Sequence, residues 1–273
     1  MPSGIFDDPS IQDIRNAVPD PAPYSLKALG RRSMPDAFES GGRTYRLVRV
    51  LKNDFFAITT VYEGDDGLVL VKVGRQAPFL LVPLGWVGRL LRAREVAILT
   101  HLEDVPGIPR LIARWGPTGL VREFAPGHPL AKGERVPDDF HERLRALVQD
   151  LHQRGVAVVD LEKCENVLVG DDGRPYLFDF QISWYLPKRW GGELAPIRWL
   201  RRRFQSGDVY HLVKLQRRTR PDQLTPEALA ASYRKPWYVI VHNNVMRPFK
   251  WLRRKILDRI DPKRDGAERG TMG

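Results

Sequence analysis

Residues 158–183 read VVDLEKCENVLVGDDGRPYLFDFQIS, and the organisation of the chain follows from this stretch outward. It contains two short apolar runs, Val167–Val169 and Tyr176–Phe178. The segment between them, Asp171–Pro175, is rich in turn-forming residues. Two apolar runs joined by such a turn predict a β-hairpin.

Three oxygen-bearing side chains flank this predicted hairpin. Asp160 and Asn166 come before its first strand, and Asp179 comes at the end of its second. Because a hairpin brings these two points together, we expect the three side chains to gather at one end of it. Such a group suits a hard cation such as Mg²⁺, which takes one or two carboxylates and shares its other ligands with phosphate and water. The alternative for Asp160 and Asn166 is turn and cap chemistry.

The same stretch resembles the protein-kinase-like superfamily, whose pattern is Asp-Leu-Lys-Pro-Glu-Asn, a strand, a turn, a second strand and Asp-Phe-Gly. Here the chain reads Asp160-Leu-Glu-Lys-Cys-Glu-Asn166 and later Asp179-Phe-Gln181, with Glu162 as an extra residue. Val158 and Val159 replace the family's His-Arg. The stretch is also loosely similar to small bacterial kinase-like proteins of the RIO and lipopolysaccharide-kinase branches, which carry D-L-x-K-x-x-N and D-F-Q.

The resemblance implies a role for each of these residues. Asp160 would orient an acceptor hydroxyl and take its proton, and Lys163 would offset charge on the transferred group. Asn166 and Asp179 would hold Mg²⁺ on the phosphates of ATP.

Two charged residues lie at positions where the pattern expects apolar ones. Lys72 shares one face of a predicted strand with Leu68 and Leu70. Glu95 lies in the apolar stripe of a helix predicted from about Val87 to Leu102. The resemblance implies that Glu95 holds Lys72 against the α- and β-phosphates of ATP. The alternative is that Lys72 snorkels and Glu95 lies at the edge of its stripe.

Two further segments correspond to nucleotide-contacting parts of the family. The connection Leu51–Ala57, between two strands predicted within Thr44–Tyr62, stands where the family has a glycine-rich phosphate loop, but it has no glycine. Residues Glu123–Gly127 resemble the segment between kinase lobes. The resemblance implies that Glu123 and Ala125 meet the adenine there.

The order of elements predicts the fold. The chain is β-rich first and helical later, with a helix capped by Asp138 and ending near Gly155. Asp208 is expected near the start of a buried helix, accepting backbone hydrogens of the loop around Asp160. The predicted fold class is α+β: a two-lobed protein-kinase-like fold with an antiparallel β-rich N-lobe and a mostly helical C-lobe.

The corresponding domain boundaries are predicted from composition and motif order. They are a mobile N-terminal tail (1–41), a kinase-like domain (42–262) made of N-lobe (42–122), hinge (123–127) and C-lobe (128–262), and a C-terminal tail (263–273).

Positive charge is concentrated late in the chain. The net charge is +11, and residues 186–264 hold 20 Lys/Arg against 6 Asp/Glu. Five of the seven tryptophans lie in or just before this region, at 184, 190, 199, 237 and 251. This composition favours an anionic partner such as a membrane surface. No RNA-binding motif accompanies it, so nucleic acid is not the expected partner. The alternative is a solvated charged face with tryptophan packed beneath, and Arg247–Ile260 predicts a basic amphipathic helix.

Other features bear on location. Cys164 is the single cysteine, which fits a reducing compartment. No signal peptide opens the chain, and the most apolar run, Ala77–Gly88, is too short to span a bilayer. We therefore expect a cytoplasmic protein, in peripheral contact with the inner membrane face if the basic region binds lipid.

These observations predict an ATP- and Mg-dependent phosphotransferase that moves the terminal phosphate of ATP to a hydroxyl acceptor, with protein Ser/Thr as the expected acceptor. The first alternative is a kinase acting on a lipid or glycan at the inner membrane surface. The second is a pseudokinase that binds a partner without turnover, favoured by the missing glycines, Glu162 and Gln181.

Overall fold

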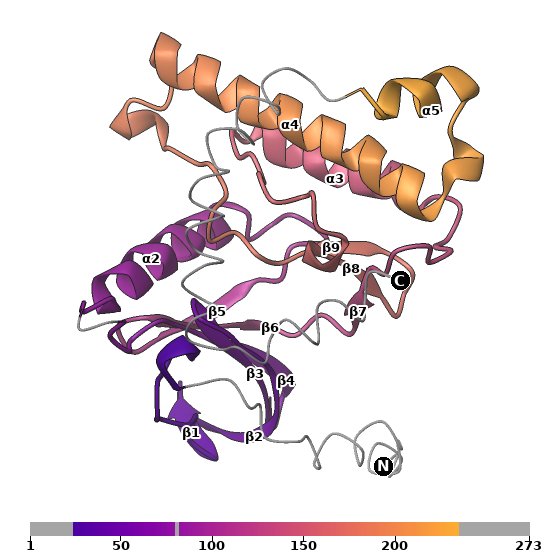
Figure 1. Cartoon of the computed structure of the whole chain (residues 1–273). Coiled ribbons are helices and arrows are strands. Elements are labelled where there is room, and N and C mark those ends of the chain that lie inside the picture. The colour runs from indigo at the N-terminus through magenta and orange to yellow at the C-terminus, as the bar shows by residue number, and fades with distance from the viewer. Residues whose placement is uncertain (1–23, 80–81, 235–273) are drawn as a thin grey trace. The chain divides into compact units, whose positions relative to one another are not determined.

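The structure, a computed structural model, describes residues 24–79 and 82–234, and these form two compact units. The first unit contains residues 24–92 and 112–124, and the second contains residues 93–111 and 125–234. Strands dominate the first unit and helices the second, so the expected α+β class, with an antiparallel β-rich part followed by a mostly helical part, is confirmed (Figure 1). The predicted boundary at 122 differs, because residues 93–111 group with the helical unit.

The first unit is built on a six-stranded sheet of order β1-β2-β3-β4-β6-β5. Its strands are β1 (Ala37–Ser40), β2 (Arg43–Asn53), β3 (Ala57–Gly64), β4 (Gly67–Gly74), β5 (Leu111–Trp115) and β6 (Gly119–Glu123). The pairs β1–β2, β2–β3, β3–β4 and β4–β6 are antiparallel. A turn at residues 64–67 joins β3 to β4, with Gly64 paired to Gly67.

One face of this sheet carries an aromatic and aliphatic core. The ring of Phe38 packs against those of Tyr45, Tyr62 and Trp115 at centroid distances of 5.1, 4.9 and 5.6 Å. The Tyr62 hydroxyl is buried and donates to the carbonyl oxygen of Pro35 at 2.7 Å. Burial raises the pKa of Tyr62 to about 12, and the charge of Asp36 adds to the effect.

The predicted tail of residues 1–41 is too long. The 3-10 helix η1 (Tyr24–Leu26) and strand β1 belong to the folded unit, and Leu29 and Met34 are buried in its core. Leu29 and Met34 hold this segment in the fold because their side chains remove apolar surface from water in the core that contains Tyr45 and Tyr62. The sequence did not predict that this segment is folded, because its apolar residues are isolated among prolines and charged residues and show no helical or strand periodicity.

The second unit combines helices with a small sheet. Its helices are α3 (Phe140–Gln153), α4 (Ala195–Thr219) and α5 (Pro226–Ser232), with 3-10 turns η2 (Cys164–Asn166), η3 (Lys188–Trp190) and η4 (Pro221–Gln223). Its strands β7 (Gly127–Pro129), β8 (Val167–Gly170) and β9 (Pro175–Leu177) form a sheet in that order. Helix α2 (Gly85–His101) begins in the first unit and continues into the second. Helix α4 lies along α3 (Figure 1).

Helix α3 follows its apolar pattern closely. Its apolar residues at helical spacing, Phe140, Leu144, Leu147, Val148 and Leu151, are all buried. The predicted cap residue is wrong, because Asp139 occupies the N-cap position and makes no side-chain cap bond. Asp138 instead forms an ion pair with Arg220 at 2.7 Å. The helix ends at Gln153, close to the predicted Gly155, whose φ of 81° suits glycine.

No helix within the described residues is long and apolar enough to cross a membrane. The predicted helix Arg247–Ile260 and the predicted C-terminal tail lie outside the described residues.

Candidate active site

The predicted hairpin is present and carries the candidate residues at one end. Strands β8 and β9 pair antiparallel, with Val167 opposite Leu177. Asn166 directly precedes β8, and Asp179 follows β9 by two positions. Strand β7 pairs with the other edge of β8, which the sequence did not predict. The register therefore places Asn166 and Asp179 at the same end of the ribbon.

Asp160 is held by two of the residues expected around it. Its carboxylate accepts hydrogen bonds from Lys163 Nζ at 3.0 Å and from Asn166 Nδ2 at 2.9 Å. The same Asn166 nitrogen donates to the Asp160 carbonyl oxygen at 2.8 Å. About a quarter of the Asp160 side chain remains exposed, at 24%. The carboxylate is thus oriented by its neighbours and still reachable from solvent.

The backbone directly before Asp160 is strained. Val159 has a φ of 71°, and it is the one non-glycine residue with positive φ in the described part of the chain. The Asp160 N–H donates to the Val158 carbonyl oxygen at 2.9 Å, which closes a γ-turn around Val159. A β-branched residue in this conformation is an outlier that costs on the order of 1–3 kcal/mol, and its surroundings must hold it there.

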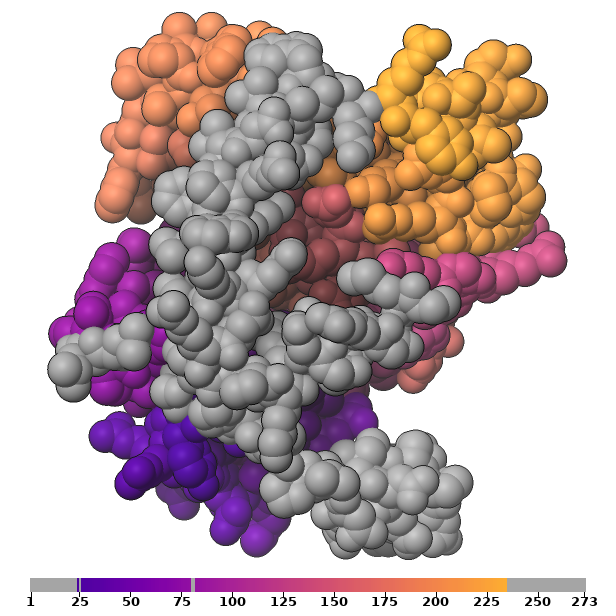
Figure 2. Space-filling view, in the orientation of Figure 1, coloured from indigo at the N-terminus to yellow at the C-terminus, as the bar shows by residue number. Residues whose placement is uncertain are grey.

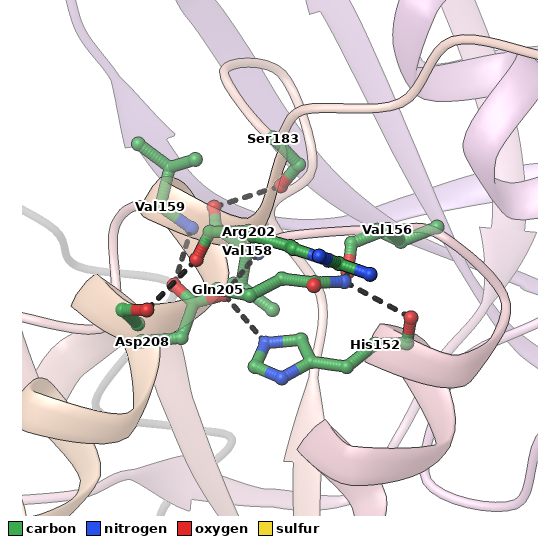
Figure 3. A network of polar contacts seen from close by, with 9 residues as sticks. His152, Val156, Val158, Val159, Ser183, Arg202, Gln205 and Asp208 are labelled. Atoms are coloured by element: carbon green, nitrogen blue, oxygen red, sulfur yellow. Dashed lines mark hydrogen bonds and ion pairs between the residues drawn. The ribbon is translucent and has the colours of Figure 1, made fainter. Parts of the chain in front are cut away.

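Asp208 supplies that restraint. Its buried carboxylate accepts hydrogen bonds from the N–H groups of Val158 and Val159, each at 2.8 Å. The ring of His152 completes the group at 2.9 Å (Figure 3). The expected acceptance of backbone hydrogens is confirmed, but Asp208 lies well inside α4 rather than near its start.

The segment after Asp179 is tied to the same loop. Phe180 is fully buried, and the Ser183 hydroxyl donates to the Val158 carbonyl oxygen at 2.9 Å. Arg94 of α2 donates to the Ser183 carbonyl oxygen at 2.8 Å. Helix α2, the Asp179 segment and the Asp160 loop are therefore linked through one serine.

The extra residue of the Asp160 loop has a defined place. The Glu162 carboxylate pairs with Lys214 of α4 at 2.6 Å, and its carbonyl oxygen accepts a hydrogen bond from Arg218 at 3.1 Å. Lys214 and Arg218, two basic residues of the region 186–264, therefore bind the Asp160 loop within the fold. The family pattern gave no signal for this contact, because it lacks the residue.

The residues present fit a magnesium ion held jointly with phosphate. The side-chain nitrogen of Asn166 donates hydrogen bonds to Asp160, so its side-chain carbonyl oxygen is the atom that could coordinate a cation. Asp179 would add a carboxylate. No group of three or more His, Cys, Asp or Glu side chains gathers as a metal site within the described residues. A sparse set of oxygen donors suits Mg²⁺, which keeps water and substrate oxygens in its shell.

Lys72 and Glu95, the two charged residues predicted on apolar faces, are both buried. Lys72 in β4 is 8% exposed and pairs with Thr59 and Leu120 across the sheet. It lies with buried Leu70 on the face opposite the aromatic core, whereas Leu68 on that face is 41% exposed. Glu95 in α2 is 1% exposed. The expected ion pair between Lys72 and Glu95 stays a prediction.

The expected adenine contacts stay predictions too. Glu123 is the last residue of β6, and Ala125 lies between β6 and β7. Gly127 opens β7 with a φ of 143°, and a Cβ there would come within 2.2 Å of the Val169 carbonyl oxygen. Glycine is therefore required where this segment joins the sheet that carries Asn166.

The loop without glycine, Leu51–Ala57, is held by two residues that the sequence analysis missed. Asp54 accepts hydrogen bonds from the N–H groups of Phe56 and Ala57 at 2.8 and 2.9 Å. Burial opposes ionisation of Asp54, but the bonds from Lys52 and these N–H groups together lower its pKa. Arg75, 1% exposed, donates to the Phe55 carbonyl oxygen at 2.9 Å, and its guanidinium lies 3.9 Å from the Phe55 ring centroid.

No family model matches the chain. No curated protein matches it either. Similar solved structures include the Rio2 kinase of Chaetomium thermophilum as an ADP/Mg²⁺-phosphoaspartate complex, with 15% identity, a TM-score of 0.48 and coverage of 76% of this chain and 62% of that one. A second Rio2 structure from that organism has 16% identity, a TM-score of 0.47 and coverage of 76% and 63%. A BubR1 kinase domain has 16% identity, a TM-score of 0.43 and coverage of 56% and 51%. The chain thus spans about three fifths of the length of the Rio2 chains that it resembles.

Proposed function

We propose that this protein is an ATP- and Mg-dependent phosphotransferase that moves the terminal phosphate of ATP to a hydroxyl acceptor, with protein serine or threonine as the first acceptor class. The observation that carries the proposal is the restrained Asp160 loop. Its carboxylate is held by Lys163 and Asn166 on a strained turn. Structures that maintain such strain concentrate at catalytic sites.

In this proposal Asp160 acts as the general base. The acceptor hydroxyl gives its proton to the Asp160 carboxylate as its oxygen attacks the terminal phosphorus, and the bond to the bridging oxygen of ADP breaks. Lys163, already within 3.0 Å of Asp160, offsets negative charge on the transferred group. A magnesium ion held by Asn166 and Asp179 would neutralise phosphate charge. Lys72 would bind the α- and β-phosphates.

A second candidate acceptor is a lipid or glycan at a membrane surface. Trp190 and Trp199 are 69% and 59% exposed on a basic segment, so these two do not pack beneath a charged face. Trp184 is different, because it is partly buried against Phe204 at a ring distance of 5.2 Å. The exposed pair favours an acceptor that lies at a lipid interface. A pseudokinase is the remaining alternative, and the loop without glycine is the feature that favours it.

The deciding experiment uses purified protein with Mg²⁺ and terminally labelled ATP, added to cell extract. Label is followed separately into protein and into the organic-extractable lipid fraction, with Asp179→Asn as the control. We expect label that depends on Asp179 and is lost in Asp160→Ala and Lys72→Ala. Label in protein selects the first acceptor class and label in lipid selects the second. No label from protein that still binds ATP would contradict the proposal and leave the pseudokinase.

A further inference from the structure

Helix α4 has two halves with different surroundings. All of its buried residues lie at or beyond Asp208, and they are Asp208, Leu212, Leu215, Gln216 and Thr219. The half from Ala195 to Gly207 has none, and in Figure 1 it extends past the end of α3. The second half therefore serves the fold and the Asp160 loop. The first half is only partly buried, through contacts such as Phe204 with Trp184 and Gln205 with the His152 carbonyl oxygen.

The first half of α4 and the turn before it also carry a set of exposed apolar and basic side chains. Trp190, Leu194 and Trp199 are 69%, 61% and 59% exposed. Their exposed basic neighbours are Lys188, Arg189, Arg198 and Arg202. We call these seven residues the Trp–Arg surface. The orange atoms of this part of the chain lie on the visible face in Figure 2.

The Trp–Arg surface is built on ordered backbone. The Trp190 N–H donates to the Pro187 carbonyl oxygen at 2.9 Å. Gly191 has a φ of 84°, and a Cβ on Gly192 would come within 2.1 Å of the Leu186 carbonyl oxygen. This tight turn fixes Trp190 beside the start of α4. The Arg203 guanidinium lies 5.6 Å from the ring centroid of Trp199.

The charge of this region is not neutralised by the fold. Residues 188–203 contain one acidic residue, Glu193, and its carboxylate pairs with Arg201 at 3.2 Å. Lys188, Arg189, Arg198 and Arg202 have no ion-pair partner within the described part of the chain. A partner that complements this surface must be anionic and must also accept exposed tryptophan and leucine.

We propose that the Trp–Arg surface docks onto an anionic lipid bilayer. Tryptophan is the side chain most suited to the headgroup region, and basic residues next to it are attracted to anionic headgroups. The segment 188–203 contains no Asn, Gln, Ser or Thr, the uncharged side chains that proteins use for hydrogen bonds to the phosphates and base edges of nucleic acids. Its chemistry is apolar plus cationic, which is that of an interfacial anchor. The proposal stands whether or not the protein transfers phosphate.

The test is flotation of the full-length protein, without nucleotide, with vesicles of phosphatidylcholine alone or mixed with phosphatidylglycerol. We expect much stronger binding to the mixed vesicles than to phosphatidylcholine alone, and we expect salt to weaken this difference because the attraction is screened. Each basic residue near an anionic surface contributes about fivefold to partitioning, so Arg198→Gln with Arg202→Gln should lower it about thirtyfold. Trp190→Ala with Trp199→Ala should remove the part of the binding that survives high salt.

The matched control is Lys132→Gln with Arg135→Gln, which removes the same charge from exposed positions elsewhere in the second unit and should leave binding within about twofold. Thermal unfolding of each variant verifies the fold. Equal loss in the control and in Arg198→Gln/Arg202→Gln would overturn the proposal, because binding would then follow net charge. A homopolymer RNA whose binding is lost in Arg198→Gln/Arg202→Gln, with vesicle binding unchanged, would assign the surface to nucleic acid and also overturn it.

Discussion

The Asp208 carboxylate accepts a hydrogen bond of 2.8 Å from the main-chain N–H of Val159, whose φ of 71° marks the strained turn before Asp160. Buried and bonded also to the Val158 N–H, Asp208 holds in place a backbone conformation that valine rarely adopts. The geometry of the candidate base therefore depends on a residue that lies in α4, far along the chain.

Asp208→Asn should loosen this turn. An amide offers one acceptor oxygen where the carboxylate offers two, so a buried N–H of Val158 or Val159 loses its partner. The expected cost is about 2–4 kcal/mol of unfolding free energy, or roughly 5–15 °C in melting temperature. Labelled-phosphate transfer should fall by more than ATP affinity does. The matched control is Asp65→Asn at an exposed position, which should change neither stability nor phosphate transfer. An Asp208→Asn protein with wild-type stability would contradict the anchoring role.

Lys214→Met tests the contact to the extra residue Glu162. The pair is 2.6 Å apart but Glu162 is 53% exposed, so its contribution to stability should be no more than about 1 kcal/mol. Its effect should appear in catalysis, as a lower kcat at unchanged ATP affinity, because the contact positions the loop between Asp160 and Asn166. Glu162→Gln combined with Lys214→Met should be no worse than either change alone. Fully additive losses would show that the two residues act separately.

Arg75→Met should release the loop without glycine. In the wild type the Arg75 guanidinium donates to the carbonyl oxygens of Phe55 and Pro78 at 2.9 and 3.0 Å, and the change removes both hydrogen bonds. Losing buried charge-assisted bonds should cost about 2–4 kcal/mol and speed hydrogen exchange in residues 52–57. The exposed Arg89→Met is the matched control. Unchanged exchange in the loop would show that Asp54 alone holds it.

His141 should make stability depend on pH. Burial lowers its pKa to about 4 from 6.5, with Arg145 and Arg220 adding to the effect, and its ring contacts Thr219 Oγ1 at 2.7 Å. Below pH 6.5 His141 is protonated in the unfolded chain, whereas in the folded chain it stays neutral until the pH falls to about 4. The stability due to neutral His141 is therefore complete above pH 6.5 and is lost as the pH falls toward 4, by about 3 kcal/mol at most. Urea unfolding of wild type and His141→Gln at several pH values should show a flatter profile for the variant, and parallel profiles would count against this.

Part of the candidate site was predictable because it is local in sequence. Asp160, Lys163, Asn166 and Asp179 lie around one hairpin, and turn chemistry between two apolar runs specifies that hairpin. The burial of Glu95 and Lys72 also followed from pattern, because helical and strand periodicity assigns each residue to a face.

The contacts that hold the site were harder to foresee. Asp208 lies 49 positions beyond Val159, and the pairing of Glu162 with Lys214 spans 52. Such pairs depend on how α4 packs against the loop, and no local propensity encodes that. The burial of Arg75 was also not predictable from local sequence. A charged residue directly after an apolar strand is normally expected to lie in solvent, and only the structure shows the carbonyl groups that surround this one.

The basic region after residue 186 best illustrates which properties follow from sequence and which require the tertiary structure. Its sequence alone determined that cations and tryptophans are concentrated after residue 186, since composition needs no structure. Only the tertiary structure decided their uses: Lys214 turns inward to the Asp160 loop, whereas Arg198 and Arg202 face solvent beside Trp199. The reason is physical: composition counts charges but does not say which way each side chain points, and that is set by packing, which buries residues of α4 fully only from Asp208 onward.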